Sequence, residues 1–286
     1  MSPAHGFRHL ERLRVRRAEV DMDGVVFSSH YLAWFDSAIA GYFRAQALPY
    51  RRTMAQLQGE LRVRKATLEY EAPARHEDLL ALGLRCTHVG RSSIAIACAC
   101  LREDARLVHG EIVYVFVDPS TGKPRPVPAL LRQALLGFEA GEPAARVRLG
   151  SWAELEGDAR PIRSAVFIDE QRIPAEMEWD AADAGCVHAV AYNRMGMPLA
   201  TGRLLEHVPG TAKIGRMAVL ASVRGSGIGR AVLDALMGAA RARGEREVLL
   251  HAQTSAAAFY LRAGFQPRGP EFDEAGIAHV EMVRGL

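Results

Sequence analysis

The pattern of apolar residues changes near the middle of the chain, at residues 138–148. This segment, FEAGEPAARVR, places glycine, proline and charged residues between two periodic regions, and it therefore predicts a linker. With 286 residues, the chain is long enough for each half to bury a core of its own. We therefore expect two domains, one over residues 1–140 and one over residues 145–286.

The first half begins with one helical segment and then becomes rich in strands. Apolar residues with helical spacing predict one buried helix over residues 31–47: Leu32, Phe35, Ile39, Tyr42 and Phe43. The strand segments that follow are separated by short polar turns: residues 61–70, 79–88, 93–101 and 111–118.

Two of these strands are apolar on both faces. In residues 93–101, isoleucines and cysteines alternate with alanines, and in residues 111–118 Ile112, Tyr114 and Phe116 alternate with valines. Both faces of such a strand need a cover. One helix covers one face, so a second copy of the domain or the C-terminal domain should cover the other. The pattern predicts an oligomer or close packing between the domains.

Composition narrows the classes of function. The formal net charge is +3, and lysine and arginine are spread along the chain, which argues against nucleic acid as a partner. No apolar run reaches the ~20 residues of a membrane helix, and residues 1–17 lack the apolar stretch of a signal peptide, so we expect a cytoplasmic protein without a membrane partner. The four cysteines suit buried reduced thiols, and no metal site is expected.

The second half alternates strands and helices. Ser151 and Glu154 form an S-x-x-E capping box, which predicts a helix start. Strands are expected over residues 186–192, 199–205, 212–220 and 247–252. A glycine-containing loop separates the third strand from an amphipathic helix that Gly244 can end. This order is typical of an α/β layer.

The glycine loop, Arg224-Gly225-Ser226-Gly227-Ile228-Gly229, is suited to bind an anion. Backbone N–H groups converge at the helix N-terminus, and glycine lets the backbone approach a phosphate closely. A Rossmann loop would need glycine at position 230, which is Arg230, and the G-K-[ST] of a Walker loop is missing. A tight turn without a ligand is the alternative interpretation.

Residues 145–286 resemble the GNAT acetyltransferases. The resemblance rests on the R-x-x-G-x-G loop and on motifs that occur in order around it: V-F-I-D-E-Q at 166–171, H-A-Q-T at 251–254, Phe259-Tyr260 and Gly264-Phe265. It implies an α/β domain that transfers an acetyl group from acetyl-CoA to a small amine or lysine-like acceptor. The implied residues for binding CoA are Met217, Ala218, Val219, Arg224, Gly225, Ser226, Gly227, Ile228 and Gly229.

The same resemblance suggests catalytic groups. Tyr260 would protonate the leaving thiolate as the general acid, and a core aromatic residue is the alternative. Glu170, Glu176, Glu178 and Asp180 form a local acidic cluster that would attract a cationic amine, with Glu178 as the base through water. The alternative for this cluster is a solvated loop face. His251 and His279 are rival bases.

Residues 8–137 resemble the hotdog thioesterases of the 4-hydroxybenzoyl-CoA type, from the stretch D-M-D-G-V-V-F-S-S-H-Y-L-A-W-F at 21–35. The resemblance implies an α+β domain with an antiparallel sheet around one helix. Asp21 would attack an acyl-CoA thioester or activate water, with free N–H donors around Gly24 to Phe27 stabilising the oxyanion. An N-terminal capping acid is the alternative for Asp21.

The first half departs from the family pattern beside Asp21. Arg17 and Ser28 stand where such relatives have tyrosine and histidine, and Phe27 follows G-V-V in place of tyrosine. The two resemblances together nevertheless lead us to expect a bifunctional CoA-thioester enzyme. Its alternative is an acetyltransferase whose hotdog domain is catalytically silent and serves dimerisation or acyl-CoA sensing. In either case the hotdog domain is expected to form a homo-oligomer.

Overall fold

The computed structural model describes residues 6–286, so the first five residues of the expected first domain lie outside it. The chain divides into two compact units, with the boundary between Ala144 and Ala145. Helix α3 (Ala129–Glu139) and strand β6 (Ala145–Gly150) occupy most of the segment expected as a linker. Only residues 140–144 lie between them. The connection begins later than expected because Phe138 is part of the apolar face that α3 buries.

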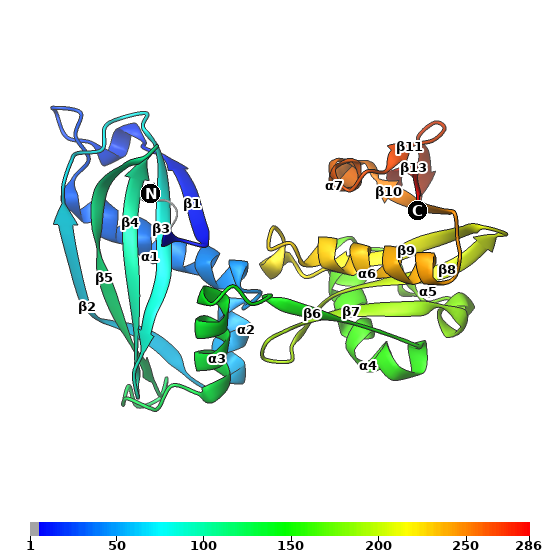
Figure 1. The fold of residues 1–286 in the computed structure, drawn as a ribbon, viewed down its shortest axis with the longest axis horizontal. Coiled ribbons are helices and arrows are strands. Elements are labelled where there is room, and N and C mark those ends of the chain that lie inside the picture. The colour runs from blue at the N-terminus through cyan, green and yellow to red at the C-terminus, as the bar shows by residue number, and fades with distance from the viewer. Residues whose placement is uncertain (1–5) are drawn as a thin grey trace. The chain divides into compact units, whose positions relative to one another are not determined.

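The N-terminal unit is an antiparallel sheet packed on one long helix, α1 (Ser28–Ala45), as the hotdog fold requires (Figure 1). The sheet has five strands in the order β1 (His9–Arg14), β3 (Leu79–Val89), β4 (Ser93–Arg102), β5 (Ala105–Val117) and β2 (Glu60–Tyr70). A short helix, α2 (Tyr50–Gln56), follows α1, and α3 packs near β3. The expected fold class of this half is confirmed.

The buried face of α1 is confirmed for three of the five residues expected on it, Phe35 among them. Leu32 is 39% exposed and Ile39 is only half-buried. In their place the helix buries Tyr31 and Trp34, which belong to the same stripe with helical spacing as Phe35. These aromatic rings remove more apolar surface from water than Leu32 does, so they determine which face meets the sheet.

Within this unit, strands β4 and β5 bury one face almost completely and the other only in part. The face that carries Ile94 and Ile96 is fully buried against α1 and its neighbours. On the opposite face, four small or branched apolar residues stay half-buried: Ala95, Ala97, Val113 and Val115. The expected cover of this face stays a prediction.

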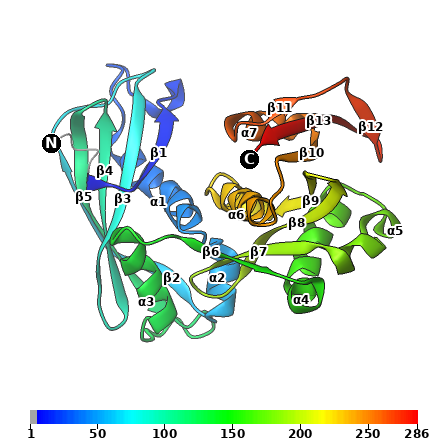
Figure 2. The ribbon, with the colours of Figure 1, turned by 45° about the vertical axis from the view of Figure 1, so that its right-hand side comes forward.

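The C-terminal unit is a mixed sheet with helices on both faces. Its strand order is β11 (Gln266–Pro267), β13 (Ile277–Gly285), β10 (Glu247–Gln253), β9 (Thr211–Val219), β8 (Pro198–Val208), β7 (Val187–Asn193) and β6, with β12 (Phe272–Glu274) beside β13. Helices α4 (Trp152–Arg163) and α6 (Ile228–Ala242) cover opposite faces (Figures 1 and 2), and α7 (Ala257–Arg262) follows β10. The GNAT fold and the Ser151–Glu154 capping box are confirmed.

Strands β9 and β10 separate partway along their length. They form the parallel pair of this sheet, and their pairing runs only from Thr211 and Glu247 to Ile214 and Leu250. Beyond that point β9 continues to Val219 without β10 beside it. The edge of β9 that faces this gap therefore has backbone groups for another partner.

Within residues 6–286, no helix combines the length and the apolar character that crossing a membrane requires.

Candidate functional sites

The loop between β9 and α6 leaves backbone donors open. Gly225 and Gly227 have φ values of +82° and +86°, a left-handed conformation that side-chain-bearing residues rarely adopt. The first hydrogen bond of α6 runs from the N–H of Ala231 to the carbonyl of Gly227. The preceding N–H groups, from Ile228 to Arg230, have no acceptor one turn earlier in the helix. They provide the anion-binding geometry that the sequence predicts.

Side chains from the other motifs hold this loop. Glu170 receives two hydrogen bonds of 2.7 Å from Arg224, whose Nε also donates to the Val219 carbonyl at 3.0 Å. Gln253 donates to Gln171 at 2.9 Å. The structure thus brings together the segments at 166–171, 224–229 and 251–254. Arg224, predicted to bind CoA, has its guanidinium paired with a protein carboxylate, which raises its pKa and lowers that of Glu170.

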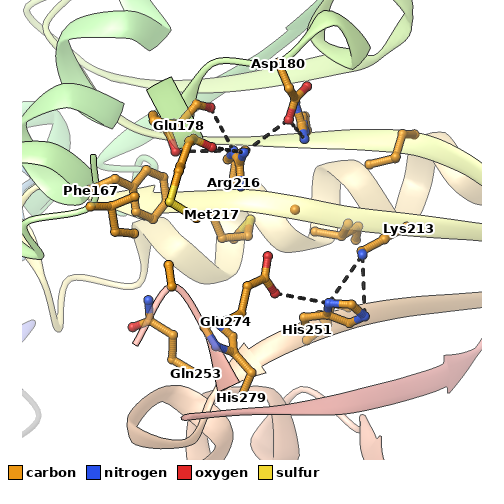
Figure 3. Close-up of a pocket in the computed structure, with 18 of the residues that line it drawn as sticks. Phe167, Glu178, Asp180, Lys213, Arg216, Met217, His251, Gln253, Glu274 and His279 are labelled. Atoms are coloured by element: carbon orange, nitrogen blue, oxygen red, sulfur yellow. Dashed lines mark hydrogen bonds and ion pairs between the residues drawn. The ribbon is translucent and has the colours of Figure 1, made fainter. Parts of the chain in front are cut away.

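A cavity of ≈300 Å³ opens beside the separated part of β9 (Figure 3). Tyr260 and Met217 line it, whereas Ala218 and Val219 do not. Burial raises the pKa of Tyr260 to about 12, so its phenol stays protonated across the neutral range. No group in the described part of the chain hydrogen-bonds the Tyr260 hydroxyl. A buried hydroxyl without a protein partner is available to a ligand.

Four members of a closed, six-membered ring of alternating charges line one side of the cavity. In order, its members are Arg163, Glu178, Arg216, Asp180, Arg203 and Asp183. Neighbouring members form ion pairs all the way around, for example Arg203 with Asp180 and with Asp183, both at 2.7 Å. Four members are buried, and Asp180 and Arg216 are partly exposed. The ring joins β8 and β9 to the segment 163–183 and carries no net charge.

Glu178, predicted as the base, is a member of this ring. Its side chain is 1% exposed, it accepts a hydrogen bond from Arg163, and Arg216 Nε lies 3.3 Å from its second oxygen. Burial raises the pKa of Glu178, while the two arginines act in the opposite direction. Glu178 lines the cavity, but both carboxylate oxygens already face guanidinium groups. The pairing favours an anchoring role.

The predicted acidic cluster is largely compensated. Glu170 pairs with Arg224, and Glu178 and Asp180 belong to the ring, which holds the pKa of Asp180 at about 2. Glu176 lies exposed on α5 (Ala175–Glu178). Little net negative charge therefore remains in this cluster to attract an amine.

The other side of the cavity carries polar residues that the sequence reasoning largely missed. Lys213 Nζ lies 3.4 Å from both ring nitrogens of His251, whose Nδ1 lies 3.3 Å from a Glu274 oxygen. Figure 3 shows Lys213, His251 and Glu274 grouped together, apart from Glu178 and Arg216. The signal that could have indicated Lys213 is a lysine between the apolar residues Ala212 and Ile214 of a central strand.

His279 also faces the cavity. Its Nδ1 lies 2.7 Å from the Ile277 carbonyl. A carbonyl only accepts, so Nδ1 carries the hydrogen, and in a neutral ring Nε2 is the nitrogen with the lone pair. Nε2 of His279 is therefore the atom that could accept a proton.

In the N-terminal unit, Asp21 closes its own loop. One carboxylate oxygen accepts hydrogen bonds from the N–H groups of Asp23 and Val25, both at 2.9 Å. The Asp21 carbonyl accepts from Gly24, whose φ is +73°. This is the local side-chain-to-backbone bonding that aspartate forms in turns.

The oxyanion donors expected between Gly24 and Phe27 are not free. Gly24 and Val25 donate to Asp21, Val26 donates to the Ala74 carbonyl, and Phe27 donates to the Glu19 carbonyl. That expectation was wrong because α1 begins only at Ser28, after the loop has satisfied itself. By helix geometry, the N–H groups of Ser28 and Ser29 are the first without an acceptor.

A second cavity lies beside Asp21 and is lined by Arg17, Asp21, Phe27 and His76. His76 comes from the segment before β3, and its N–H donates to the Gly24 carbonyl at 3.4 Å. The sequence did not single out His76, because it lies 55 positions from Asp21 and only the fold brings the two segments together.

Comparisons with known proteins match the two halves separately. Residues 158–286 match the family model described as an acetyltransferase (GNAT) domain, and residues 23–109 match the thioesterase superfamily. The Bacillus subtilis (strain 168) protein named uncharacterized N-acetyltransferase YjcF is 37% identical over 128 residues, which cover 44% of this chain and 90% of that protein.

The acyl-CoA thioester hydrolase YbgC of Escherichia coli O6:H1 is 32% identical over 117 residues, which cover 41% of this chain and 87% of that protein. The crystal structure of an acyl-CoA N-acyltransferase from Pseudomonas aeruginosa is 31% identical, with a TM-score of 0.44, and the match covers 49% of this chain and 99% of that one.

Proposed function

The chain belongs to the thioesterase superfamily through its N-terminal half and to the GNAT acetyltransferases through its C-terminal half, and on this premise we propose that it transfers an acetyl group from acetyl-CoA to an amine. The observation that carries the proposal is the gap between β9 and β10, which opens next to a loop with free N–H groups and to the free hydroxyl of Tyr260. Together these supply a binding site for the cosubstrate and an acid at its reactive end.

The residues present fit acetyl-CoA. The N–H groups at the start of α6 would bind its pyrophosphate, with Gly225 and Gly227 holding the loop in the required left-handed conformation. Gly229 allows α6 to lie close to β9, because a Cβ at this position would meet Val219 Cγ2 at 3.2 Å. The free edge of β9 from Met217 to Val219 would bind the pantetheine arm through backbone groups.

Acetyl transfer forms a bond between the amine nitrogen and the carbonyl carbon and breaks the bond from that carbon to sulfur. One proton leaves the amine, and one reaches the departing thiolate. Tyr260 would donate the second proton because this residue lines the cavity and its phenol stays protonated.

For the first proton the geometry favours His279, whose Nε2 is open, over Glu178, whose oxygens face Arg163 and Arg216. Glu178 as a base through water stays a prediction. His279→Gln should lower amine-dependent kcat/KM by about 10²-fold, the typical loss of a general base, and Glu178→Gln should lower it less. A larger loss in Glu178→Gln than in His279→Gln would assign the base to the carboxylate.

The transferase itself is tested with the full chain, acetyl-CoA and a panel of amines. Thiol release that depends on an amine, accompanied by an acetylated product, is the expected result. Acetyl-CoA binding without transfer to any amine would contradict the proposal.

For the N-terminal half we propose slow hydrolysis of an acyl-CoA thioester. The second carboxylate oxygen of Asp21 is not used by the two loop hydrogen bonds, and Ser28 and Ser29 offer N–H donors close by. Asp21 would activate water, and these donors would stabilise the oxyanion.

A catalytically silent domain is the second candidate, and one observation favours it. The carboxylate of Asp21 already has a structural use, since it closes the loop that precedes α1. A silent domain would bind acyl-CoA or support self-association, so thiol release by Asp21 variants separates the two candidates.

Self-association through the hotdog sheet is also part of the proposal. The outer face of β4 and β5, with Ala95, Ala97, Val113 and Val115, is apolar and only half-buried. Covering it with a second copy would remove that surface from water. We expect the full chain to be larger than a monomer in light scattering at micromolar concentration, and Val113→Glu to dissociate it. A monomeric wild type would contradict this.

A further inference from the structure

The charge balance of the C-terminal cavity leaves two side chains uncompensated. The ring accounts for Glu178, Asp180, Arg203 and Arg216, because each of them forms ion pairs with opposite charges. Glu281, which lies near His251, pairs with Arg268 at 2.6 Å. What remains of the charged groups that line the cavity is Lys213 and Glu274.

Lys213 is a half-buried cation without a carboxylate partner. Its one polar contact within the described residues is the His251 ring, and burial lowers its pKa. Glu274 and Glu281 attract this ammonium group only from beyond ion-pair distance, and the loss of water outweighs them, so a ligand that brings an anion directly to it would bind there.

Glu274 is the opposite charge beside the same histidine. Its oxygen lies 3.3 Å from His251 Nδ1, its side chain is half-exposed, and no lysine or arginine in residues 6–286 pairs with it. Lys213 and Glu274 thus both contact His251 without forming an ion pair with each other, and Figure 3 shows the Glu274 carboxylate on the side of Met217.

From this separation of charges we propose that the acceptor is a small zwitterion, an amino-acid-like molecule whose amine faces Glu274 and whose carboxylate binds Lys213. The inference rests on the proposed acetyltransferase function and narrows its substrate class. A cavity of ≈300 Å³ lies at the low end of the ~300–1,000 Å³ of ligand sites, which suits an acceptor of this size.

The direction of binding follows from β9. Lys213 precedes Met217 by four residues, which is roughly 13 Å of strand at ~3.3 Å per residue. Tyr260 and Met217 mark the end where the acetyl group is transferred, so the amine belongs there and the carboxylate belongs towards Lys213. An amine with a second cationic group would place that group against Lys213 and be rejected.

The experiment uses the full chain, acetyl-CoA and matched acceptors in sets of three. Each set contains an amino acid, its carboxamide and the amine that has neither a carboxylate nor a carboxamide. The three sets are built on glycine, leucine and lysine. We expect kcat/KM for the amino acid to exceed that for its carboxamide by about tenfold or more, the typical effect of one charge-assisted hydrogen bond.

Three variants assign this preference to Lys213. In Lys213→Gln the preference should fall towards unity, and in Lys213→Arg it should be kept. Lys123→Gln, the same change on an exposed turn, should leave it intact. Acetyl-CoA affinity, which depends on the loop at 224–229, should be equal in all three and reports that the domain is folded.

The outcomes separate this inference from the function beneath it. Equal use of amino acids and carboxamides, or a preference that survives in Lys213→Gln, overturns the zwitterion inference and leaves the transferase standing. If acetyl-CoA binds but the acetyl group is transferred neither to the nine acceptors nor to any other amine, the transferase function and this inference are both overturned.

Discussion

Two loops in this chain lead into helices, contain glycine in the left-handed conformation and lie in domains of CoA-thioester families. They differ in whether their backbone N–H groups are already hydrogen-bonded. The loop before α1 uses the N–H groups of Gly24, Val25, Val26 and Phe27 on its own carboxylate and on nearby carbonyls. The loop before α6 is held from outside by the pair of Glu170 and Arg224, and the first N–H groups of α6 stay open.

The difference shows what an anion site at a helix N-terminus requires. Glycine and a helix start are not sufficient, because an acidic side chain inside the loop can take the place of the ligand. Asp21 does this in the first loop. In the second loop the acid is Glu170, which lies in a distant segment and binds a side chain, so the donors are left for a phosphate.

The largest expected effect concerns the charge ring that supports the C-terminal site. Arg163→Met removes one of the two arginines that each of the buried carboxylates Glu178 and Asp183 faces, and should cost ~3–5 kcal/mol of unfolding free energy. Arg102→Met, which removes a partly exposed pair with Asp78 in the N-terminal unit, should cost ~0–1 kcal/mol. Denaturant unfolding of the full chain measures both.

The pH dependence of the ring has a definite sign. Its arginines lower the pKa of Asp180 to about 2. This group therefore stabilises the folded state above its unfolded pKa, and that contribution is lost as the pH falls towards 2.

Equal losses of unfolding free energy in Arg163→Met and Arg102→Met would show that the ring does not support the fold around the site.

The second prediction compares two buried tyrosines. Tyr260→Phe removes a hydroxyl that has no protein partner, so the fold should be kept while amine-dependent turnover falls by about 10²-fold, the typical contribution of a general acid. Tyr31→Phe removes a hydroxyl that accepts from the Ala74 N–H, and should cost ~1 kcal/mol of stability with normal transfer. Turnover within twofold of the wild type in Tyr260→Phe would contradict the acid role.

The third prediction places one substitution in each loop. Gly227→Val and Gly24→Val both add a side chain at positive φ with no heavy atom within 4 Å of the new Cβ, so both should be strained to a similar degree. Only Gly227→Val should weaken acetyl-CoA binding, by about 10- to 100-fold, because it moves donors away from the pyrophosphate. Calorimetric titration that finds equal affinities in the two variants would remove the loop at 224–229 as the CoA site.

The sequence predicted what depends on local patterns. Alternation and helical spacing predicted the helix and main strands of each half, and the resemblances gave both fold classes. The strand β1 was missed because His9–Arg14 is largely polar and becomes a strand only by pairing with β3. In α1 the burial of Phe35, Tyr42 and Phe43 was predicted, but Leu32 was placed with them because spacing alone could not choose between Leu32 and the aromatic rings beside it.

At the sites, the sequence could name residue types but not their partners. It identified the loop at 224–229, Tyr260 and Asp21 from contiguous motifs. It could not show that Glu178 faces two arginines, since Arg163 and Arg216 lie in separate elements. The same holds for Lys213 and Glu274, which the sheet brings to one cavity from positions 61 residues apart.

The smallest expected signal decides whether the first loop is a catalytic site or only a turn. Asp21→Asn keeps an oxygen that can accept from Asp23 and Val25, so the loop and the fold should survive. It removes the charge that would activate water. The wild-type rate of hydrolysis should be slow, because Arg17 and Ser28 occupy the positions of the usual tyrosine and histidine. We therefore expect this rate to drop only about tenfold, below the ~10²-fold typical of a base.

The measurement is thiol release from short, aromatic and long acyl-CoAs without an amine, in a background that already carries Tyr260→Phe. That background matters because an acetyltransferase site can itself leak hydrolysis of acetyl-CoA. A rate that falls with Asp21→Asn assigns the hydrolysis to the N-terminal unit and gives the self-closed loop a function beyond its own stability. Equal rates in the two proteins would make Asp21 a loop-closing residue alone, and the contrast between the two loops would then separate a binding site from a turn.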